Sequence, residues 1–221
     1  MIVTIDGPAG AGKSTVAREL ARRLGFCFLD TGAMYRAVAW AAARQGLAWD
    51  DQTAVAELAA HLPLVFDSHR ILVDGQDVTL AIRSQEVTHN TRYVADNPLV
   101  RAQLVALQRR LAHGRHVVTE GRDQGTVAFP AAECKFFLIA SPRERARRRW
   151  QQLQERGESM MLEDVLAQQN QRDARDARRA CGPLTPAPDA LIVDTDGLTQ
   201  TQVVDTLERL VRERGTADAW E

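Results

Sequence analysis

The chain has 221 residues, of which 45% are hydrophobic and 26% are charged, and its formal net charge at pH 7 is −1. This length and composition predict one sizeable globular domain, with room for insertions. A net charge near zero argues against a protein that attracts nucleic acid or an acidic membrane through its overall field, so any positive site must be local.

The first predicted elements are a strand, a glycine-rich loop and a helix. An apolar run precedes the loop, and apolar residues at helical spacing follow it. Between them, Gly7, Gly12, Lys13 and Ser14 match the G-x-x-x-x-G-K-[S/T] phosphate loop. We expect Lys13 to reach the β- and γ-phosphates of ATP and the Ser14 hydroxyl to hold Mg²⁺. The predicted ATP-binding residues are Gly7, Pro8, Ala9, Gly10, Ala11, Gly12, Lys13, Ser14 and Thr15.

Apolar runs and helical patterns alternate along most of the chain. Further strands are predicted at 26–30, 116–123, 134–141 and 190–195, and Pro142 is placed to begin a helix. This alternation is typical of an α/β fold in three layers, with a parallel sheet covered by helices on both faces.

The segment 63–115 breaks this alternation. Asp74-Gly75 stands between two extended stretches, which indicates an antiparallel hairpin, and a helix with Val100 and Leu104 on one face follows. We interpret the segment as an insertion on the core sheet. Insertions at the carboxyl ends of parallel strands commonly build a substrate site.

The cysteines and the start of the chain bear on its compartment. Cys27, Cys134 and Cys181 are odd in number and lack ligand spacing, so we expect buried, small apolar side chains in a reducing compartment. The first predicted strand begins at once, without a targeting segment, and no apolar run is long enough to cross a bilayer. We expect a cytoplasmic monomer without nucleic acid or membrane partners.

Charged residues follow the predicted strands, where an open parallel sheet binds its ligands. A further cluster of charged residues lies in the segment QRDARDARRACGPL. If that segment is helical, Arg172, Asp176 and Arg179 share one face. They could hold a sugar phosphate, with arginines on phosphate oxygens and the carboxylate on ribose hydroxyls. The alternative is a solvated face with ordinary ion pairs.

Several segments, taken together and in order, resemble the bacterial cytidylate kinases of the nucleoside monophosphate kinase group. The matching segments are IDGPAGAGKST, LDTGAMYR, IRSQEV, EGRDQGTVAFP, CKFFLIAS and RDARDARRACGPLTPAPDALIVDT. The resemblance implies transfer of the ATP γ-phosphoryl group to CMP or dCMP, with Mg²⁺ as cofactor. It also implies that 63–115 is a nucleoside monophosphate (NMP)-binding subdomain and that 150–170 is a mobile lid.

The resemblance further implies the residues that contact CMP. Arg36 and Thr31 would contact its phosphate, Asp123 and Arg101 its base, and Arg122 the base or phosphate side. A carboxylate suits the exocyclic amine of cytosine, whereas uracil offers a carbonyl there. Arg172 and Asp176 would face the sugar, and Arg179 the phosphate. The implied catalytic residues are Lys13, Arg36, Arg122 and Arg179.

Two positions depart from the family pattern. Arg92 stands where members often carry a small hydroxyl residue near the cytosine, and Arg178 stands where they often carry asparagine. Thr91 could substitute for the missing hydroxyl, which leaves the detail of base selection open. In the lid region, some of Arg145, Arg148 and Arg149 could close on the transferred phosphoryl group, or form a basic outer face.

Other functions remain as alternatives. A kinase with the same core could act on UMP, dCMP or a non-nucleotide acceptor. A GTPase would need an Asn-Lys-x-Asp stretch, and the two lysines, Lys13 and Lys135, do not supply one. A nucleic-acid-binding ATPase would need a concentrated basic surface, which the net charge disfavours.

Overall fold

The computed structural model describes residues 1–67, 70–155 and 157–215. The chain divides into two compact units, one formed by Met1–Leu29 with Ala112–Glu221 and the other by Asp30–Leu111. Residues 68–69 and 156, which belong to the expected insertion and lid, lie outside the described residues.

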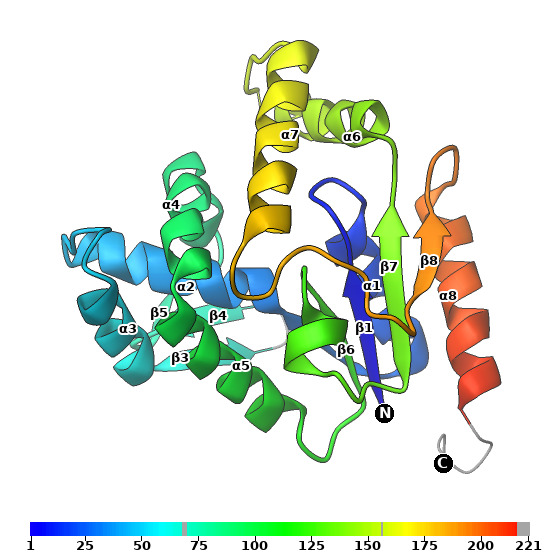
Figure 1. Cartoon of the computed structure of the whole chain (residues 1–221), viewed down its shortest axis with the longest axis horizontal. Coiled ribbons are helices and arrows are strands. Elements are labelled where there is room, and N and C mark those ends of the chain that lie inside the picture. Colours follow the sequence, from blue (N-terminus) through cyan, green and yellow to red (C-terminus); the bar gives the residue numbers. More distant parts are fainter. Residues whose placement is uncertain (68–69, 156, 216–221) are drawn as a thin grey trace. The chain divides into compact units, whose positions relative to one another are not determined.

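The first unit contains a five-stranded sheet in the order β2-β6-β1-β7-β8 (Figure 1). Strand β1 pairs in parallel with β6 on one side and with β7 on the other, and β7 pairs in parallel with β8. The predicted parallel α/β class is therefore confirmed. Its elements are β1 (Ile2–Asp6), α1 (Lys13–Leu24), β2 (Cys27–Asp30), β6 (Val117–Glu120), the π-helical turn η2 (Gln124–Ala128), β7 (Cys134–Ile139), α6 (Pro142–Glu155), α7 (Leu162–Arg178), β8 (Leu191–Asp194) and α8 (Gln200–Arg214).

The core of this unit lies between the sheet and the helices α1 and α8. Val3 and Ile5 of β1 pack in one buried cluster with Leu20 of α1 and Leu207 of α8, and all four side chains are fully buried. Val3 and Ile5 share one face of β1, and Thr4 and Asp6 on the other face are buried as well, so both faces of this central strand are covered. This packing fixes the carboxyl end of β1, where the glycine-rich loop begins.

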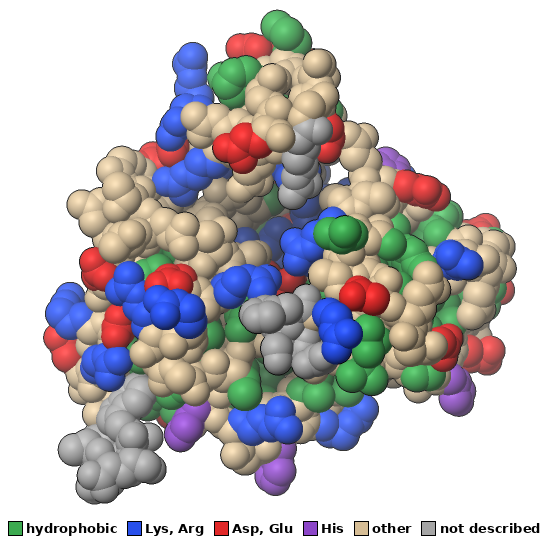
Figure 2. All heavy atoms as spheres, turned by 180° about the vertical axis from the view of Figure 1, so that it is seen from behind, with side chains coloured by type: hydrophobic (Ala, Val, Ile, Leu, Met, Phe, Trp, Pro, Cys, Tyr) green, Lys and Arg blue, Asp and Glu red, His purple; other side chains and the backbone are tan. Residues whose placement is uncertain are grey.

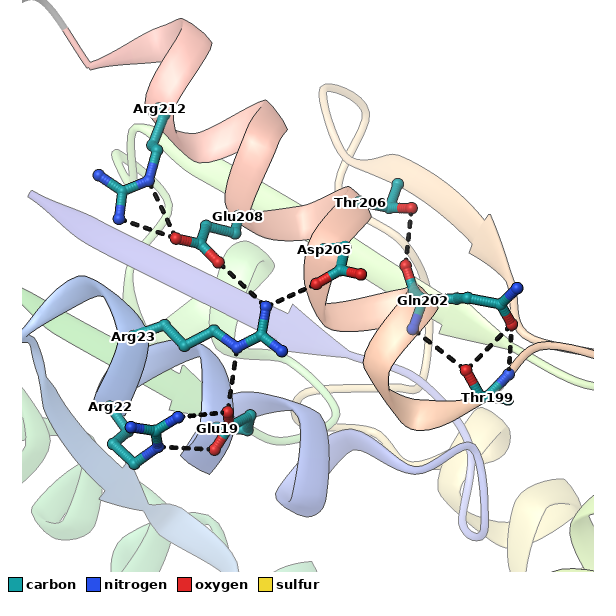
Figure 3. Close-up of polar contacts among 9 residues, drawn as sticks. All are labelled: Glu19, Arg22, Arg23, Thr199, Gln202, Asp205, Thr206, Glu208 and Arg212. Atoms are coloured by element: carbon teal, nitrogen blue, oxygen red, sulfur yellow. Dashed lines mark hydrogen bonds and ion pairs between the residues drawn. The ribbon is translucent and has the colours of Figure 1, made fainter.

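Arg23 joins α1 to α8 at the surface (Figure 3). Its guanidinium lies 3.0 Å from Glu19 on its own helix, 2.5 Å from Asp205 and 3.3 Å from Glu208 on α8. Arg212 of α8 in turn pairs with Glu208 at 2.8 Å. On the left of Figure 2, where α8 lies after the half turn, acidic and basic side chains are intermixed. A mixed network of this kind cancels charge locally and leaves no single-sign patch on α8.

The second unit combines a small antiparallel sheet, in the order β3-β4-β5, with helices. Asp74 and Gly75 both have positive φ angles, 49° and 75°, and form the predicted two-residue hairpin turn between β4 and β5. Helix α2 packs against α3 and α4. The elements are α2 (Thr31–Arg44), α3 (Gln52–His61), β3 (Leu64–Asp67), β4 (Arg70–Val73), β5 (Gln76–Asp77), the 3₁₀ turn η1 (Ala81–Arg83), α4 (Gln85–Asp96) and α5 (Pro98–Ala112).

Helices α3 and α4 were not among the predicted elements. Both begin at a capping side chain. Asp51 accepts a hydrogen bond from the Ala54 amide at 2.9 Å, and Ser84 accepts one from Val87 at 3.3 Å. Helix α4 buries only Val87 and Val94, so its sequence is too polar to show a clear helical stripe.

The prediction that all three cysteines are buried is wrong for two of them. Cys134 is buried on the central strand β7, but Cys27 and Cys181 are exposed. Cys27 lies on β2, which is an edge strand of the sheet, and Cys181 follows the end of α7. Among the residues that the structure describes, no helix is both long enough and apolar enough to cross a membrane.

The core and the surface network should respond differently to substitution. Leu20→Ala removes a fully buried side chain from the α1–α8 core, and we expect it to lower the free energy of unfolding by about 2–5 kcal/mol. Arg23→Gln should lower the free energy of unfolding clearly less than Leu20→Ala does. Its effect, unlike that of Leu20→Ala, should become smaller in high salt, because salt screens ion pairs at the surface. Denaturant titrations at low and high salt measure both effects. Equal losses from the two variants would contradict this assignment.

Candidate active site

The loop between β1 and α1 has the backbone of an anion-binding loop. Gly7 has a φ angle of +143°, and a Cβ at this position would lie 2.1 Å from the carbonyl oxygen of Leu138. Gly12, with a φ angle of 87°, leads directly into α1. Only glycine fits at the first position, and the amides at the start of α1 point into the loop.

Lys13 is buried inside this loop, with 5% of its surface exposed. Its Nζ donates a hydrogen bond to the Pro8 carbonyl oxygen at 2.7 Å. Burial, and after it the charge of Arg122, lowers the pKa of Lys13 to about 7, although Glu120 opposes the shift. Burial and neighbouring cations disfavour the charged form of this lysine. A bound anion would raise its pKa again and stabilise the charged form.

Ser14 faces a carboxylate at the end of the neighbouring strand. Its hydroxyl donates a hydrogen bond to Glu120 Oε1 at 2.8 Å, and Glu120 is 6% exposed. Hydroxyl and carboxylate oxygens are the ligands that Mg²⁺ prefers, so this donor set fits the expected metal ion. The sequence interpretation missed Glu120, although an acidic residue that ends a buried apolar strand was a usable signal.

Helices α6 and α7 contact the loop at Ala9. The Ala9 amide donates to Asp173 Oδ1 at 3.2 Å, and Arg145 Nη1 donates to the Ala9 carbonyl oxygen at 3.0 Å. Arg145 and Asp173 also form an ion pair. Arg145 is therefore buried and hydrogen-bonded to the loop backbone. Arg148 likewise has protein partners, since it pairs with Glu144 at 2.8 Å and donates to the Thr195 carbonyl oxygen at 2.7 Å.

Three arginines of the first unit converge on Asp176 of α7. Its carboxylate lies 3.0 Å from Arg122 Nε, 2.8 Å from Arg179 Nη2 and 4.0 Å from Arg172 Nε. Burial by itself would raise the pKa of Asp176, but the three positive charges outweigh it and lower the pKa. The expected helix and shared face are confirmed for Arg172 and Asp176, whereas Arg179 lies just beyond the end of α7 and reaches Asp176 from there. Arg122 joins the cluster from the loop after β6. Such a cluster can hold a phosphate and hydroxyl groups of one ligand.

Asp123 lies in the loop after β6, next to this cluster in sequence. It is 6% exposed, and its carbonyl oxygen accepts the amides of Val127 and Ala128, at 2.8 and 3.2 Å, which close the turn η2. A π-helical turn is rare and recurs at functional sites. The loop therefore holds Arg122 and Asp123 on a backbone with a defined conformation.

In the second unit, Asp30 brings two arginines together. Its carboxylate caps α2 by accepting the Ala33 amide at 2.8 Å, and it lies 3.3 Å from Arg36 and 3.7 Å from Arg83. Thr31, at the first turn of α2, is 2% exposed. The sequence interpretation selected Arg36 and Thr31 but missed Arg83. Its segment, IRSQEV, was noted only as a family match.

Three further residues of this unit, Arg101, Arg92 and Thr91, are those that we expected to bear on base selection. Arg101 is 5% exposed, and its guanidinium lies 5.8 Å from the centre of the Tyr35 ring. Arg92 stacks on the Tyr93 ring at 4.6 Å and donates to the Tyr93 hydroxyl at 2.7 Å. The Thr91 hydroxyl donates to the Val87 carbonyl oxygen at 2.6 Å, within its own helix.

The predicted site residues thus fall into two sets. Arg122, Asp123 and the α7 cluster lie in the first unit with the phosphate loop, and the remaining acceptor residues, Thr31, Arg36 and Arg101, lie in the second. In the residues that the structure describes, no cluster of three or more histidine, cysteine, aspartate or glutamate side chains forms a metal site by itself. An oxygen site at Ser14 and Glu120 would need further ligands from a bound phosphate or water.

Comparisons with known proteins agree on one family. A family model described as cytidylate kinase matches residues 3–213. A cytidylate kinase from Rhodopirellula baltica is 54% identical over 99% of this chain and 96% of its own length, and one from Caldanaerobacter subterraneus is 43% identical over 95% and 94%. A solved structure of an uncharacterized protein from Eubacterium ventriosum shares the fold, with a TM-score of 0.54 at 9% identity, covering 96% of this chain and 98% of the other. With a matching family model over nearly the whole chain and relatives of this identity, the chain belongs to the cytidylate kinase family.

Proposed function

We propose that this chain transfers the γ-phosphoryl group of ATP to the phosphate of CMP or dCMP, giving ADP and CDP or dCDP. The observation that carries the proposal is a phosphate loop with a buried Lys13, in the same unit as three arginines that converge on Asp176. The loop suits the donor triphosphate, and the cluster suits an anionic acceptor that carries hydroxyl groups.

The acceptor and donor both carry negative charge, so neutralisation and alignment are the main tasks of the site. We assign Lys13 to the β- and γ-phosphates and Arg36, Arg122 and Arg179 to the acceptor phosphate. Asp176 and Arg172 would hold the sugar, with the carboxylate accepting from ribose hydroxyls. The attacking phosphate oxygen is already deprotonated at neutral pH, so we assign no general base.

Asp123 and Arg101 are assigned to the cytosine ring, with the phosphate contact of Thr31 completing the acceptor set. A buried carboxylate can accept a hydrogen bond from the exocyclic amine of cytosine and repels the carbonyl oxygen of uracil. The insertion 63–115 would be the NMP-binding subdomain and 150–170 the lid. We further propose that the chain acts as a cytoplasmic monomer without nucleic acid or membrane partners.

Ser14 and Glu120 would hold Mg²⁺ together with phosphate oxygens of ATP. The ion would supply charge neutralisation between the β- and γ-phosphates. The hydrogen bond between these two side chains keeps both oxygens together, 2.8 Å apart. Glu120 is therefore proposed as a metal-site residue in addition to Ser14.

The substrate assignment is tested by replacing the carboxylate that would read the base. In Asp123→Asn the side chain keeps its size but can now also donate a hydrogen bond to the uracil carbonyl. We expect kcat/KM for CMP to fall about 10- to 100-fold and the rate with UMP relative to CMP to rise. A coupled ADP-release assay with CMP, dCMP, UMP, AMP and GMP measures this.

The matched control is Asp77→Asn, which makes the same change at an exposed carboxylate that accepts the Thr79 amide at 2.9 Å. It should leave the ranking of the five substrates unchanged. If another monophosphate is the best substrate of the unsubstituted protein, the cytidylate assignment fails. If CMP is best but Asp123→Asn leaves the CMP to UMP ratio unchanged, the role of Asp123 fails.

The metal assignment is tested by titrating Mg²⁺. Glu120→Gln removes the negative charge next to Ser14, and we expect the Mg²⁺ concentration for half-maximal rate to rise roughly 10- to 100-fold. Glu133→Gln, at an exposed carboxylate elsewhere in the same unit, is the control. Chelation of the metal should abolish phosphoryl transfer in all three proteins. An unchanged Mg²⁺ titration in Glu120→Gln would remove Glu120 from the metal site.

A further inference from the structure

Asp6 is a buried carboxylate that none of the roles assigned above uses. It ends β1, immediately before Gly7, and is 4% exposed. Its two oxygens accept hydrogen bonds from successive backbone amides across the sheet, Oδ1 from Gln124 at 2.9 Å and Oδ2 from Gly125 at 2.8 Å. A carboxylate that holds two consecutive amides fixes both the position and the direction of that backbone.

The bound amides directly follow the residues assigned to the acceptor, Arg122 and Asp123. The start of the same loop is also fastened to β1, because the Gly121 amide donates to the Ile5 carbonyl oxygen at 3.1 Å. The loop is therefore hydrogen-bonded to β1 at both of its ends, at Gly121 and at Gly125, which are only four positions apart. Its two assigned side chains project from the stretch between these attachments.

Side chains enclose the loop at Gln124 and Gly125. A Cβ added to Gly125 would lie 3.0 Å from Thr4 Oγ1, 3.3 Å from Lys135 Cδ and 3.5 Å from Asp6 Oδ2. The Gln124 side chain is buried, and its Oε1 accepts from the Thr119 hydroxyl at 2.9 Å. The backbone has little free space here, so we expect a change at the Asp6 contact to displace the loop and, with it, Arg122 and Asp123.

The charge of Asp6 suits this role. Burial, with a smaller contribution from the charge of Asp123, raises the pKa of Asp6 to about 6, although the two amides and Lys13 oppose the shift. At neutral pH the carboxylate is therefore mainly ionised. Hydrogen bonds to an ionised acceptor are stronger than bonds between neutral groups, which favours a rigid loop.

We propose that Asp6 is a positioning residue for the acceptor nucleotide, because its carboxylate holds the amides of Gln124 and Gly125 and thereby sets where Arg122 and Asp123 meet CMP. The inference rests on the proposed roles of those two residues. It places a determinant of base selectivity on the strand that leads into the donor loop, at a residue that does not touch the base.

The test is Asp6→Asn, which preserves the size of the side chain but replaces one of the two accepting oxygens by a donor. We expect KM for CMP to rise about tenfold or more and the CMP to UMP ratio of kcat/KM to fall, while KM for ATP changes less than twofold. The matched control is Asp51→Asn, an exposed carboxylate that likewise accepts a backbone amide, at 2.9 Å. It should leave all three constants unchanged.

A second variant crowds the same loop. Gly125→Ala would bring a Cβ to 3.0 Å from Thr4 Oγ1, 3.3 Å from Lys135 Cδ and 3.5 Å from Asp6 Oδ2 without changing the Asp6 side chain itself. It should displace the backbone at Gly125 and reproduce the loss of CMP selectivity with an unchanged KM for ATP. Thermal unfolding of each variant establishes that the folded protein is being assayed. If Asp6→Asn does not fold, Gly125→Ala decides the question by the same readouts.

Comparison with Asp123→Asn separates the possible failures. In an Asp123→Asn background, Asp6→Asn should lower the CMP to UMP ratio no further, and independent, multiplying effects would overturn the inference. If Asp123→Asn changes selectivity but Asp6→Asn does not, the positioning role alone fails. If Asp123→Asn has no effect on selectivity, the proposed site assignment fails. A rise in KM for ATP as large as that for CMP would assign Asp6 to the donor loop instead.

Discussion

The parallel pairing of β1 with β6 is the constraint on which the candidate site depends. Ile5 lies opposite Glu120 in this register, so the two strands end at the same edge of the sheet. The donor loop and the loop that carries Arg122 therefore start from neighbouring points, although they are far apart along the chain. The hydrogen bond between Ser14 and Glu120 and that between Gly121 and Ile5 both follow from this register.

The second constraint on the site is that its buried charges need partners. An uncompensated buried charge is costly, so the cations of the site pair with oxygens of the protein. Lys13 bonds the Pro8 carbonyl oxygen, Arg145 pairs with Asp173, and three arginines surround Asp176. A phosphorylated ligand would exchange these partners for its own oxygens, so the site requires little new order when the ligand binds.

The same side chains also perform local structural tasks. Asp30 caps α2 and, in addition, lies between Arg36 and Arg83. Asp6 ends β1 and also holds the first amides of the turn η2. Substitution at such positions changes folding and function together. For this reason the proposed tests compare selectivity and binding constants rather than activity alone.

Features specified by short stretches of chain could be read from the sequence. The phosphate loop needs glycine at positions 7 and 12, where φ is positive, and the hairpin at Asp74-Gly75 likewise needs residues that tolerate positive φ. The shared face of Arg172 and Asp176 follows from helical spacing alone. The parallel strands were visible because each contains a short group of apolar residues.

Other features depended on contacts between distant residues, and only the tertiary structure decided them. The polar helix α4 has too few apolar residues for a clear period, and Cys27 is exposed because β2 lies at the edge of the sheet. Glu120 gains its role from pairing across the sheet, and Arg122 joins Asp176 only when α7 reaches the loop after β6. The sequence by itself determined the local anion-binding loop and the helical spacing of the charged residues. The fold decided which of those charges became partners, because strand order and helix packing set the distances between them.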